Sequence, residues 1–489
     1  MISKKFLTSS FVYTVVGALP LASSIILLPF YTWYLKTDKF GELAIYISFT
    51  FLMQIIAGFS MEGAISVFYY DYKHDKTKLK HYVGSLVSGM ITSGIITMLM
   101  SLCFGNLLFK AIFKGDEISF YPYGFMSVVT AFFNVFFKAY TSLLINQQKP
   151  FKFFLVNFFN FVITIIISLG GLYFYKHTLV GPMWGRLLSG VGIFILALVL
   201  FISEFGIYIH LEYIKKTLKY CFPLVLYFII LWSLNYLDRY IINYFMNPSD
   251  VGIYDFTSRG TSVIDFIMIG LSNAMMPKLF SIWQNDKLEN NSADVNRYFH
   301  SFSAIGVLLI AGIILFLPIL IPLVIYNHAY YVSFKYIPLA ALNYVSRALI
   351  LVYFLPIYFF KKTKALPWIY FACALIQIPL TIILVKHYGL WGALWSAILT
   401  KPVQIIFMYL ATRKLIKYSY NVVKMIILPT LYSVMVIFGE IYFKMINPVW
   451  IHLAEMIISC LVVYLLFRKE LISSFQKIIV KDLLKGKGF

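Results

Sequence analysis

Charged residues are scarce in this chain, and acidic residues are the scarcest of them. Charged residues make up 12% of the 489 positions, and 20 Asp and Glu stand against 41 Lys and Arg. Soluble domains carry roughly 25% charged residues, so this composition excludes an ordinary soluble protein. Cysteine is also rare, and the 4 cysteines fall in separate apolar runs without metal-ligand spacing or a disulfide framework. We therefore expect inert thiols and no metal site.

Long apolar runs are what the chain has instead. Hydrophobic residues make up 61% of the sequence, and apolar runs of about 20 residues recur from end to end. Because these runs are continuous and do not alternate, they predict helices and exclude the strands of a membrane barrel. We predict an all-α polytopic membrane protein with about fourteen transmembrane helices. The predicted segments are 11–34, 41–68, 82–109, 120–145, 151–175, 180–202, 218–246, 252–279, 299–326, 332–360, 365–386, 390–411, 421–444 and 449–467.

Lys and Arg concentrate in the loops on one side of the predicted membrane, the side that also holds both termini. They include Lys4 and Lys5, the lysines between Lys73 and Lys80, and the tail from Arg468. Cytoplasmic loops carry an excess of Lys and Arg, so both termini are expected in the cytoplasm. The first run continues to Tyr34, which is too long for the apolar part of a cleaved signal peptide. The formal net charge of +21 therefore needs no nucleic-acid partner.

An internal repeat divides most of the chain in two. A shift of about 211 residues brings similar segments into register, which indicates a duplicated unit. The matches are Gly41 with Gly252; Leu179, Gly181 and Trp184 with Leu390, Gly392 and Trp395; and, at a shift of about 209, Asn134 and Lys138 with Asn343 and Arg347. An even number of spans per repeat makes the repeats parallel. We predict six-helix bundles at 1–205 and 206–417, an extra helix pair at 418–467 and a basic cytoplasmic tail at 468–489.

Charged residues inside the predicted spans are the candidate functional residues. The cations are Lys138, Arg186, Arg239, Arg259, Arg347 and Lys401, and the acids are Glu62, Asp238, Asp255 and Asp265. An unpaired charge costs about 2.5–3.5 kcal/mol at the bilayer centre, and cations remain even if every acid forms a pair. We therefore predict a water-filled cationic cavity for an anionic, phosphate-bearing substrate. The acids either pair with cations, as Asp255 and Arg259 can one helical turn apart, or carry coupling protons or sodium ions.

Three short motifs, together with the doubled six-helix plan, resemble a known family. They are Asp238-Arg239 late in the seventh span, Val251-Gly252-Ile253-Tyr254 opening the eighth, and Gly389-Leu-Trp-Gly392-Ala. Their order and spacing are similar to those of polysaccharide (O-antigen, capsule or exopolysaccharide) repeat-unit flippases, members of the multidrug/oligosaccharidyl-lipid/polysaccharide exporter superfamily. The resemblance implies a V-shaped pair of bundles in the bacterial cytoplasmic (inner) membrane. Its substrate would be an undecaprenyl-pyrophosphate-linked oligosaccharide, moved from the cytoplasmic to the outer leaflet.

The same resemblance implies which residues and partners take part. Cavity cations of the family map most directly onto Arg239 and Arg259, whereas Lys138, Arg186, Arg347 and Lys401 are added by their depth in the membrane. The implied partners are the lipid-linked oligosaccharide and membrane lipids, and the resemblance allows a polysaccharide polymerase and a chain-length regulator as well. It implies no cofactor. The extra helix pair could form a groove for the lipid tail or pack on the outside.

Two other classes of protein stay open. A multidrug exporter of the same fold would favour acidic groups and a cationic substrate, and the surplus of cations argues against it. A polysaccharide polymerase or a glycosyltransferase generally needs a sizeable outer domain, and the outer loops predicted here are short. The sequence contains no phosphate-binding loop and no nucleophile–base arrangement, so we expect a transporter without covalent chemistry.

Overall fold

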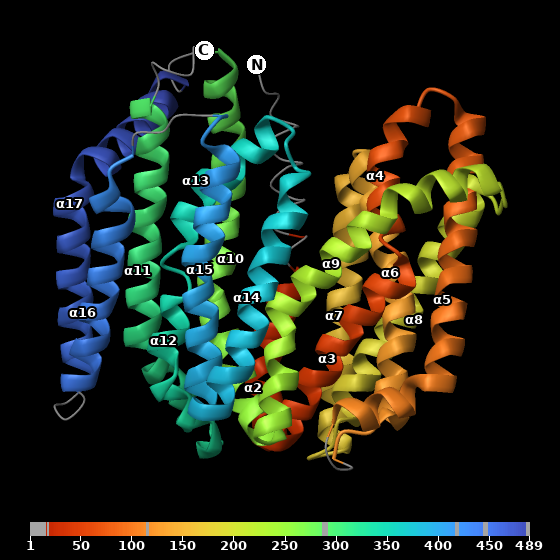
Figure 1. The fold of residues 1–489 in the computed structure, drawn as a ribbon, viewed down its shortest axis with the longest axis horizontal. Coiled ribbons are helices and arrows are strands. Elements are labelled where there is room, and N and C mark those ends of the chain that lie inside the picture. Colours follow the sequence, from red (N-terminus) through yellow and green to blue (C-terminus); the bar gives the residue numbers. More distant parts are fainter. Residues whose placement is uncertain are drawn as a thin grey trace. The chain divides into compact units, whose positions relative to one another are not determined.

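The computed structural model of the protein consists of helices and their connections. It describes Val16 and residues 19–113, 117–285, 292–415, 420–443 and 448–485. Helices α2 to α17 and three short helical segments, η1 to η3, account for this part of the chain, which contains no strand (Figure 1). The N-terminal lysines, the beginning of the first predicted span and the last residues of the basic tail lie outside the described residues.

The helices in the first part of the chain follow one another with short connections. They are α2 (Leu19–Tyr34), α3 (Thr37–Gly58), α4 (Met61–Tyr72), α5 (Lys76–Ile112), η1 (Phe120–Gly124), α6 (Phe125–Asn146), α7 (Pro150–Phe174), α8 (Val180–Phe205), α9 (Leu211–Phe245) and α10 (Pro248–Asn285). The later part contains α11 (Ser292–Val324), η2 (His328–Lys335), α12 (Ile337–Leu342), α13 (Arg347–Phe359), α14 (Ala365–Tyr388), α15 (Leu390–Thr412), η3 (Val423–Ile427), α16 (Leu428–Phe443) and α17 (Pro448–Lys485).

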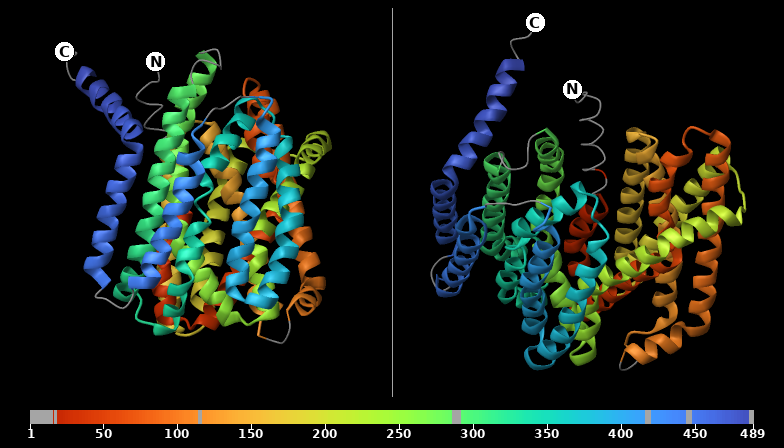
Figure 2. Two further views of the ribbon diagram at one scale, coloured as in Figure 1. Left: turned by 60° about the vertical axis from the view of Figure 1, so that its left-hand side comes forward. Right: turned by 45° about the horizontal axis from the view of Figure 1, so that its top comes forward.

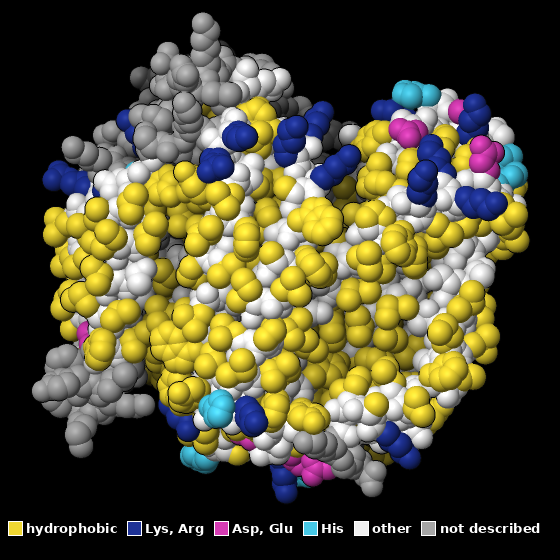
Figure 3. Space-filling model, viewed as in Figure 1, with side chains coloured by type: hydrophobic (Ala, Val, Ile, Leu, Met, Phe, Trp, Pro, Cys, Tyr) yellow, Lys and Arg dark blue, Asp and Glu magenta, His cyan; other side chains and the backbone are white. Residues whose placement is uncertain are grey.

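The predicted membrane spans are present as helices. Within the described residues, 12 helices are long and apolar enough to cross a membrane, and Val423–Phe438 forms a shorter apolar helix. The first predicted span corresponds to α2. Hydrophobic side chains cover the visible middle of the helices, whereas Lys and Arg gather at their ends (Figure 3). The prediction of an all-helical polytopic membrane protein is confirmed.

Two of the predicted spans are interrupted. Segment 41–68 divides into α3 and α4, because Phe59 and Ser60 adopt left-handed conformations with φ of 46° and 56°. Segment 332–360 divides into η2, α12 and α13, and a turn at 343–346 separates the last two. Both interruptions lie next to charged residues singled out in the sequence, Glu62 and Arg347.

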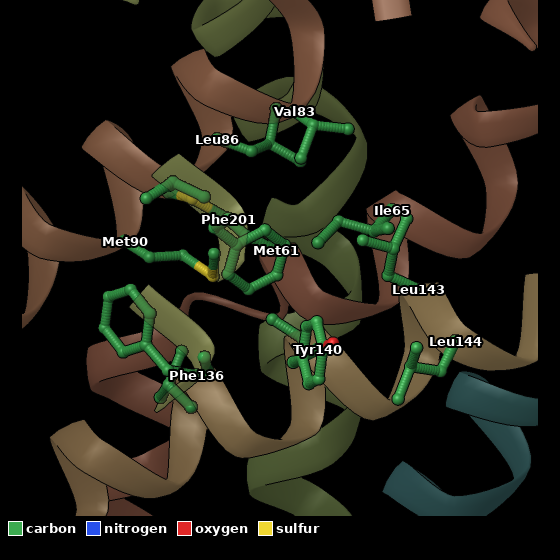
Figure 4. Close-up of a cluster of buried hydrophobic side chains, with 14 of the residues drawn as sticks. Met61, Ile65, Val83, Leu86, Met90, Phe136, Tyr140, Leu143, Leu144 and Phe201 are labelled. Atoms are coloured by element: carbon green, nitrogen blue, oxygen red, sulfur yellow. The ribbon is translucent and has the colours of Figure 1, made fainter. Parts of the chain in front are cut away.

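The chain forms two compact units. Unit 1 contains residues 1–256 and 381–390, and unit 2 contains residues 257–380 and 391–489. The core of unit 1 lies between α4, α5, α6 and α8 (Figure 4). Met61, Phe136 and Phe201 are at its centre and are almost completely buried. The division into bundles at 1–205 and 206–417 with an extra helix pair stays a prediction from the sequence.

In unit 2, the last two helices pack on α11. Both α16 and α17 contact α11, and the two helices lie side by side in the views of Figure 2. Ala304 and Val307 of α11 form a small buried cluster with Val463 and Phe467 of α17. These contacts bury one face of the pair and leave side chains such as Leu465 exposed, as expected for helices surrounded by lipid.

Gly41 and Gly252, which the sequence predicts to be repeat equivalents, contact each other within unit 1. A Cβ atom on Gly41 would lie 1.8 Å from the carbonyl oxygen of Pro248, and one on Gly252 would lie 2.0 Å from that of Thr37. The Thr37 and Ser249 hydroxyls are 2.6 Å apart. The first turns of α3 and α10 therefore touch reciprocally, backbone against backbone. Only glycine permits so close an approach.

Candidate functional site

The first charged cluster joins α9 to α10 in unit 1. Asn247 caps the start of α10, where its Oδ1 accepts a hydrogen bond from Asp250 N at 3.0 Å, and Pro248 follows as the first helical residue. This turn reverses the chain, so that α10 runs back alongside α9. Arg239 of α9 then reaches Asp255 of α10, with Nε 2.9 Å and Nη2 2.8 Å from Asp255 Oδ1.

Arg239 is also held by its own helix. Its Nη1 donates to Asp238 Oδ1 and to the carbonyl oxygen of Asn235, both at 2.9 Å. The rings of Tyr236 and Tyr254 lie 5.2 Å and 5.7 Å from the guanidinium carbon, within cation–π range.

The whole arrangement is buried and internally bonded. The side chains of Arg239 and Asp255 are 9% and 2% exposed. The hydroxyl of Tyr254 donates to Asp238 Oδ2. A buried charge needs pairing and hydrogen bonds to be tolerated, and Arg239 has both. Its geometry is that of a residue that holds two helices together; its predicted contact with substrate stays a prediction.

The second charged cluster lies in unit 2 and is more open. Arg347, the first residue of α13, places Nη2 2.9 Å from Asp265 Oδ1 on α10, and the two side chains are 38% and 35% exposed. Lys401 of α15 lies within electrostatic range of both residues, and it forms no ion pair within the described part of the chain. Two cations therefore face one acid, and one positive charge is left over.

A helix break places Arg347 in this cluster. Helix α12 ends at Leu342, and residues 343–346 form turns before α13 begins. Asn343 and Ser346 lie in these turns, and short polar side chains compete with helical hydrogen bonding. Ser346 gives α13 no side-chain cap, and within the described residues Asn343 Oδ1 and Ser346 Oγ have no hydrogen-bond partner. The positive end of the α13 dipole thus lies beside Arg347.

Glu62 and Lys138, two further residues singled out in the sequence, lie in unit 1 and are arranged differently. Glu62 is in the first turn of α4, directly after the left-handed residues that end α3. Its Oε2 is buried and has no hydrogen-bond partner among the described residues. Lys138, on the uninterrupted helix α6, is within electrostatic range of Glu62, although no ion pair joins these two described side chains.

The two remaining predicted cations are Arg186 and Arg259. Arg186 is in the second turn of α8 and is half-buried. Arg259 is on α10, one turn after Asp255, and is also half-buried. The sequence identified the members of both clusters only as charged residues inside predicted spans, and not which of them pair. It missed the two helix breaks, whose only local signals are the polar residues Ser60, Asn343 and Ser346.

Unit 2 also contains an apolar groove. It has a volume of about 330 Å³ and lies between α10, α11 and α17. Ile264 and Ile267 of α10, Leu308 and Phe316 of α11, and Met456 of α17 are among the residues that line it. The extra helix pair therefore packs on α11 and also borders a groove, so both of its expected roles remain open.

The fold and these sites are those of a polytopic helical membrane protein with charged groups held inside its spans, as in transporters. The family described as "Polysaccharide biosynthesis protein" matches residues 6–283. This is more than half of the chain, and the chain belongs to that family. The predicted resemblance to the polysaccharide flippases is thereby confirmed.

Two curated relatives come from Haemophilus influenzae. "Lsg locus putative protein 1" is 23% identical over 275 residues, which cover 54% of this chain and 63% of that protein. An "Uncharacterized membrane protein" is 23% identical over 293 residues, which cover 58% of this chain and 66% of that protein. The matched part thus spans less than two thirds of each relative.

Solved structures share the fold. "Lipid II flippase MurJ, inward closed conformation" matches with a TM-score of 0.74 and 16% identity, covering 96% of this chain and 100% of that one. An "inward-facing conformation of a multidrug resistance MATE family transporter of the MOP superfamily" matches with a TM-score of 0.66 and 15% identity, covering 82% and 95%. At these identities the likeness establishes a flippase and transporter fold.

Proposed function

We propose that this protein is a flippase for a lipid-linked oligosaccharide repeat unit carried on undecaprenyl pyrophosphate. It moves this unit from the cytoplasmic to the outer leaflet of the bacterial inner membrane by alternating access, and both of its termini are cytoplasmic. The observation that carries the proposal is the surplus positive charge of Arg347 and Lys401 over Asp265, held inside the spans of unit 2. Membership of the polysaccharide biosynthesis family supports it.

The cluster can bind a pyrophosphate by exchanging one ion pair for another. Asp265 holds Arg347 through a single 2.9 Å contact while both side chains stay partly exposed. A guanidinium binds phosphate oxygens through two parallel hydrogen bonds. The substrate phosphate therefore replaces Asp265 as the partner of Arg347, and Lys401 supplies the second positive charge. Helix α13 has no side-chain cap at its start, so the positive end of its dipole adds to the attraction for the phosphate.

The other predicted cations have separate roles. Arg186, Arg259 and Lys138 are candidate contacts for the phosphates and sugars of the substrate, and Arg239 holds the α9–α10 hairpin in shape. Glu62, with its unpartnered oxygen, is the candidate carrier of a coupling proton. A polysaccharide polymerase and a chain-length regulator are the partners that would receive the product.

A transport assay with matched variants tests the proposal. We expect Arg347→Gln and Lys401→Gln each to slow translocation of a lipid-linked oligosaccharide in proteoliposomes by roughly ten- to a hundredfold, since a charged hydrogen bond contributes about 1.5–3 kcal/mol. Lys362→Gln, which removes an exposed lysine from the turn after α13, is the control and should leave the rate unchanged. If all three variants transport at the wild-type rate, the anion-binding role of the cluster is wrong.

A multidrug exporter is the second candidate, and one observation favours it. In unit 1, Asp238 and Asp255 together bond the single guanidinium of Arg239, and acidic groups suit cationic drugs. Efflux of a lipophilic cation such as ethidium from cells expressing the protein distinguishes the two functions. The flippase predicts no efflux above an empty-vector control, and efflux abolished by Asp238→Asn would favour the exporter.

A further inference from the structure

The connection between α8 and α9, residues 206–210, lies against α5. Gly206 adopts a left-handed φ of 77°, which turns the chain at the end of α8. The connection then passes Gly84 so closely that a Cβ atom there would lie 2.8 Å from both Gly206 O and Tyr208 Cδ2. The absence of a side chain at Gly84 is therefore what lets the connection lie on the helix.

Hydrogen bonds from the same face of α5 hold this connection in place. The Ser88 hydroxyl donates to the carbonyl oxygen of Tyr208 at 2.8 Å. The backbone N–H of His210, the residue before α9, donates to the hydroxyl of Ser85 at 3.1 Å. Ser85 is completely buried. The beginning of α9 is thus fixed to α5 through backbone groups of the connection.

A stack of three rings completes the contact. The His81 ring, on α5, lies 4.4 Å from the ring of Tyr208 and 4.7 Å from that of His210. His81 is half-buried and His210 is exposed, so protons from solvent can reach both rings.

The surroundings of the two histidines offer little compensating charge. Tyr213 of α9 contacts His210 at 5.8 Å, and Tyr72 of α4 contacts Tyr213. Lys80 precedes His81 on α5 and Glu212 follows His210 on α9, and within the described residues neither histidine has an ion-pair partner. Neither ring is therefore paired with a carboxylate among the described residues.

We propose that residues 206–210 form a proton-released strap: it fixes the start of α9 to α5 while at most one of His81 and His210 is protonated, and it detaches when both are. One imidazolium is stabilised by the neighbouring aromatic faces. Two imidazolium groups with ring centres 4.7 Å apart repel each other. Histidine is the side chain whose charge can change between about pH 5 and pH 8, so this is the range in which release is to be measured.

Release of the strap has a mechanical consequence. Helix α9 begins immediately after His210 and extends to the residues that bond Arg239 to α10. Freeing its first turn removes one of the contacts that hold α9 in unit 1. The strap is thus a device by which acidity on the side of Lys76–Lys80, predicted to be cytoplasmic, changes the freedom of α9.

Hydrogen exchange tests the strap without any transport substrate. The full-length protein in nanodiscs is compared at about pH 7.5 and about pH 5.5, with intrinsic exchange rates normalised. We expect the protection of residues 206–213 in the wild type to fall by roughly tenfold at the lower pH. His81→Phe and His210→Phe keep a ring in the stack and remove one charge, so their protection should not depend on pH.

Two results would overturn the proposal. One is a wild-type protection factor that is the same at both pH values; the other is a fall of equal size in the wild type and in the Phe variants. If a Phe variant does not fold, His210→Gln, which removes the charge without adding bulk, takes its place. Gly84→Ala provides the positive control, because its methyl group would displace the strap and lower protection at both pH values.

Discussion

Arg239 in unit 1 and Arg347 in unit 2 are both paired with an aspartate on α10, yet they are available to a ligand to different degrees. The Arg239 and Asp255 side chains are 9% and 2% exposed, and Arg239 has further bonds to Asp238 and Asn235. The Arg347 and Asp265 side chains are 38% and 35% exposed and share a single contact. Burial and the number of partners, rather than charge alone, separate the arginine that stabilises a hairpin from the one that can bind a substrate.

The backbone at Arg347 also differs from the backbone at its predicted repeat equivalent, Lys138. Arg347 begins α13 after a break at 343–346, whereas Lys138, its predicted repeat equivalent, lies inside the continuous helix α6. A break exposes backbone groups and gives the side chain a new direction. Lys138 and Arg347 thus lie in unequal settings, and the more open backbone is in unit 2.

Removing the acid of the buried pair should give the largest loss of stability. We expect Asp255→Asn to lower the free energy of unfolding by about 1.5–3 kcal/mol, because it removes a buried charged hydrogen-bond partner of Arg239 while Asp238 still pairs with the guanidinium. Thermal unfolding in detergent, compared with the wild type, measures the effect. A loss below about 1 kcal/mol would mean that water or another group already compensates Arg239, and the contrast with Arg347 would disappear.

Disrupting the close packing next to the α9–α10 hairpin should give the second largest loss of stability. A methyl group on Gly252 would meet the carbonyl oxygen of Thr37 at 2.0 Å, so we expect Gly252→Ala to cost about 1–3 kcal/mol. Gly192 on α8 has no neighbouring atom within 4 Å of the position that a Cβ atom would take, and Gly192→Ala should be neutral or stabilising by about 0.5–1 kcal/mol. Equal effects of the two substitutions on thermal unfolding would contradict the reciprocal glycine contact.

Removing the acid of the open pair should hardly change stability. We expect Asp265→Asn to alter the free energy of unfolding by less than about 1 kcal/mol, since water can solvate a half-exposed guanidinium. Binding of inorganic pyrophosphate should tighten, because Arg347 no longer has to leave a carboxylate. Calorimetry checks the binding. A destabilisation as large as that of Asp255→Asn would show that the two pairs are alike.

The smallest effect on stability is expected from the exposed carboxylate of Asp75. Asp75 caps α5 and accepts hydrogen bonds from Lys78 N and Thr77 N, both at 3.1 Å, which lower its pKa below the ordinary value of 3.8. Because the folded pKa is the lower one, the stabilisation is present above pH 3.8 and is lost as the pH falls through the folded pKa. Asp75→Ala should raise hydrogen exchange only in the first turn of α5 at neutral pH, and an effect on global unfolding would contradict this.

The spans were predictable from the sequence because a bilayer requires about 20 apolar residues per helix. Predicting the partners of the charges was harder. Asp255 and Arg259 are one turn apart and offer an obvious local pair, whereas Arg239 reaches Asp255 from 16 residues away, across the hairpin. The breaks at Phe59–Ser60 and 343–346 depend on backbone conformations that hydropathy does not encode. Gly41 and Gly252 were recognisable as equivalent, and their mutual contact appeared only in three dimensions.

Equilibrium binding of an undecaprenyl-pyrophosphate-linked oligosaccharide to the protein in nanodiscs tests the central claim most directly. The cluster of Arg347, Lys401 and Asp265 predicts that Arg347→Gln weakens binding by roughly tenfold or more without lowering thermal stability. Lys362→Gln should bind as tightly as the wild type. Equal affinity of Arg347→Gln and the wild type would contradict the assignment of the anion site to unit 2.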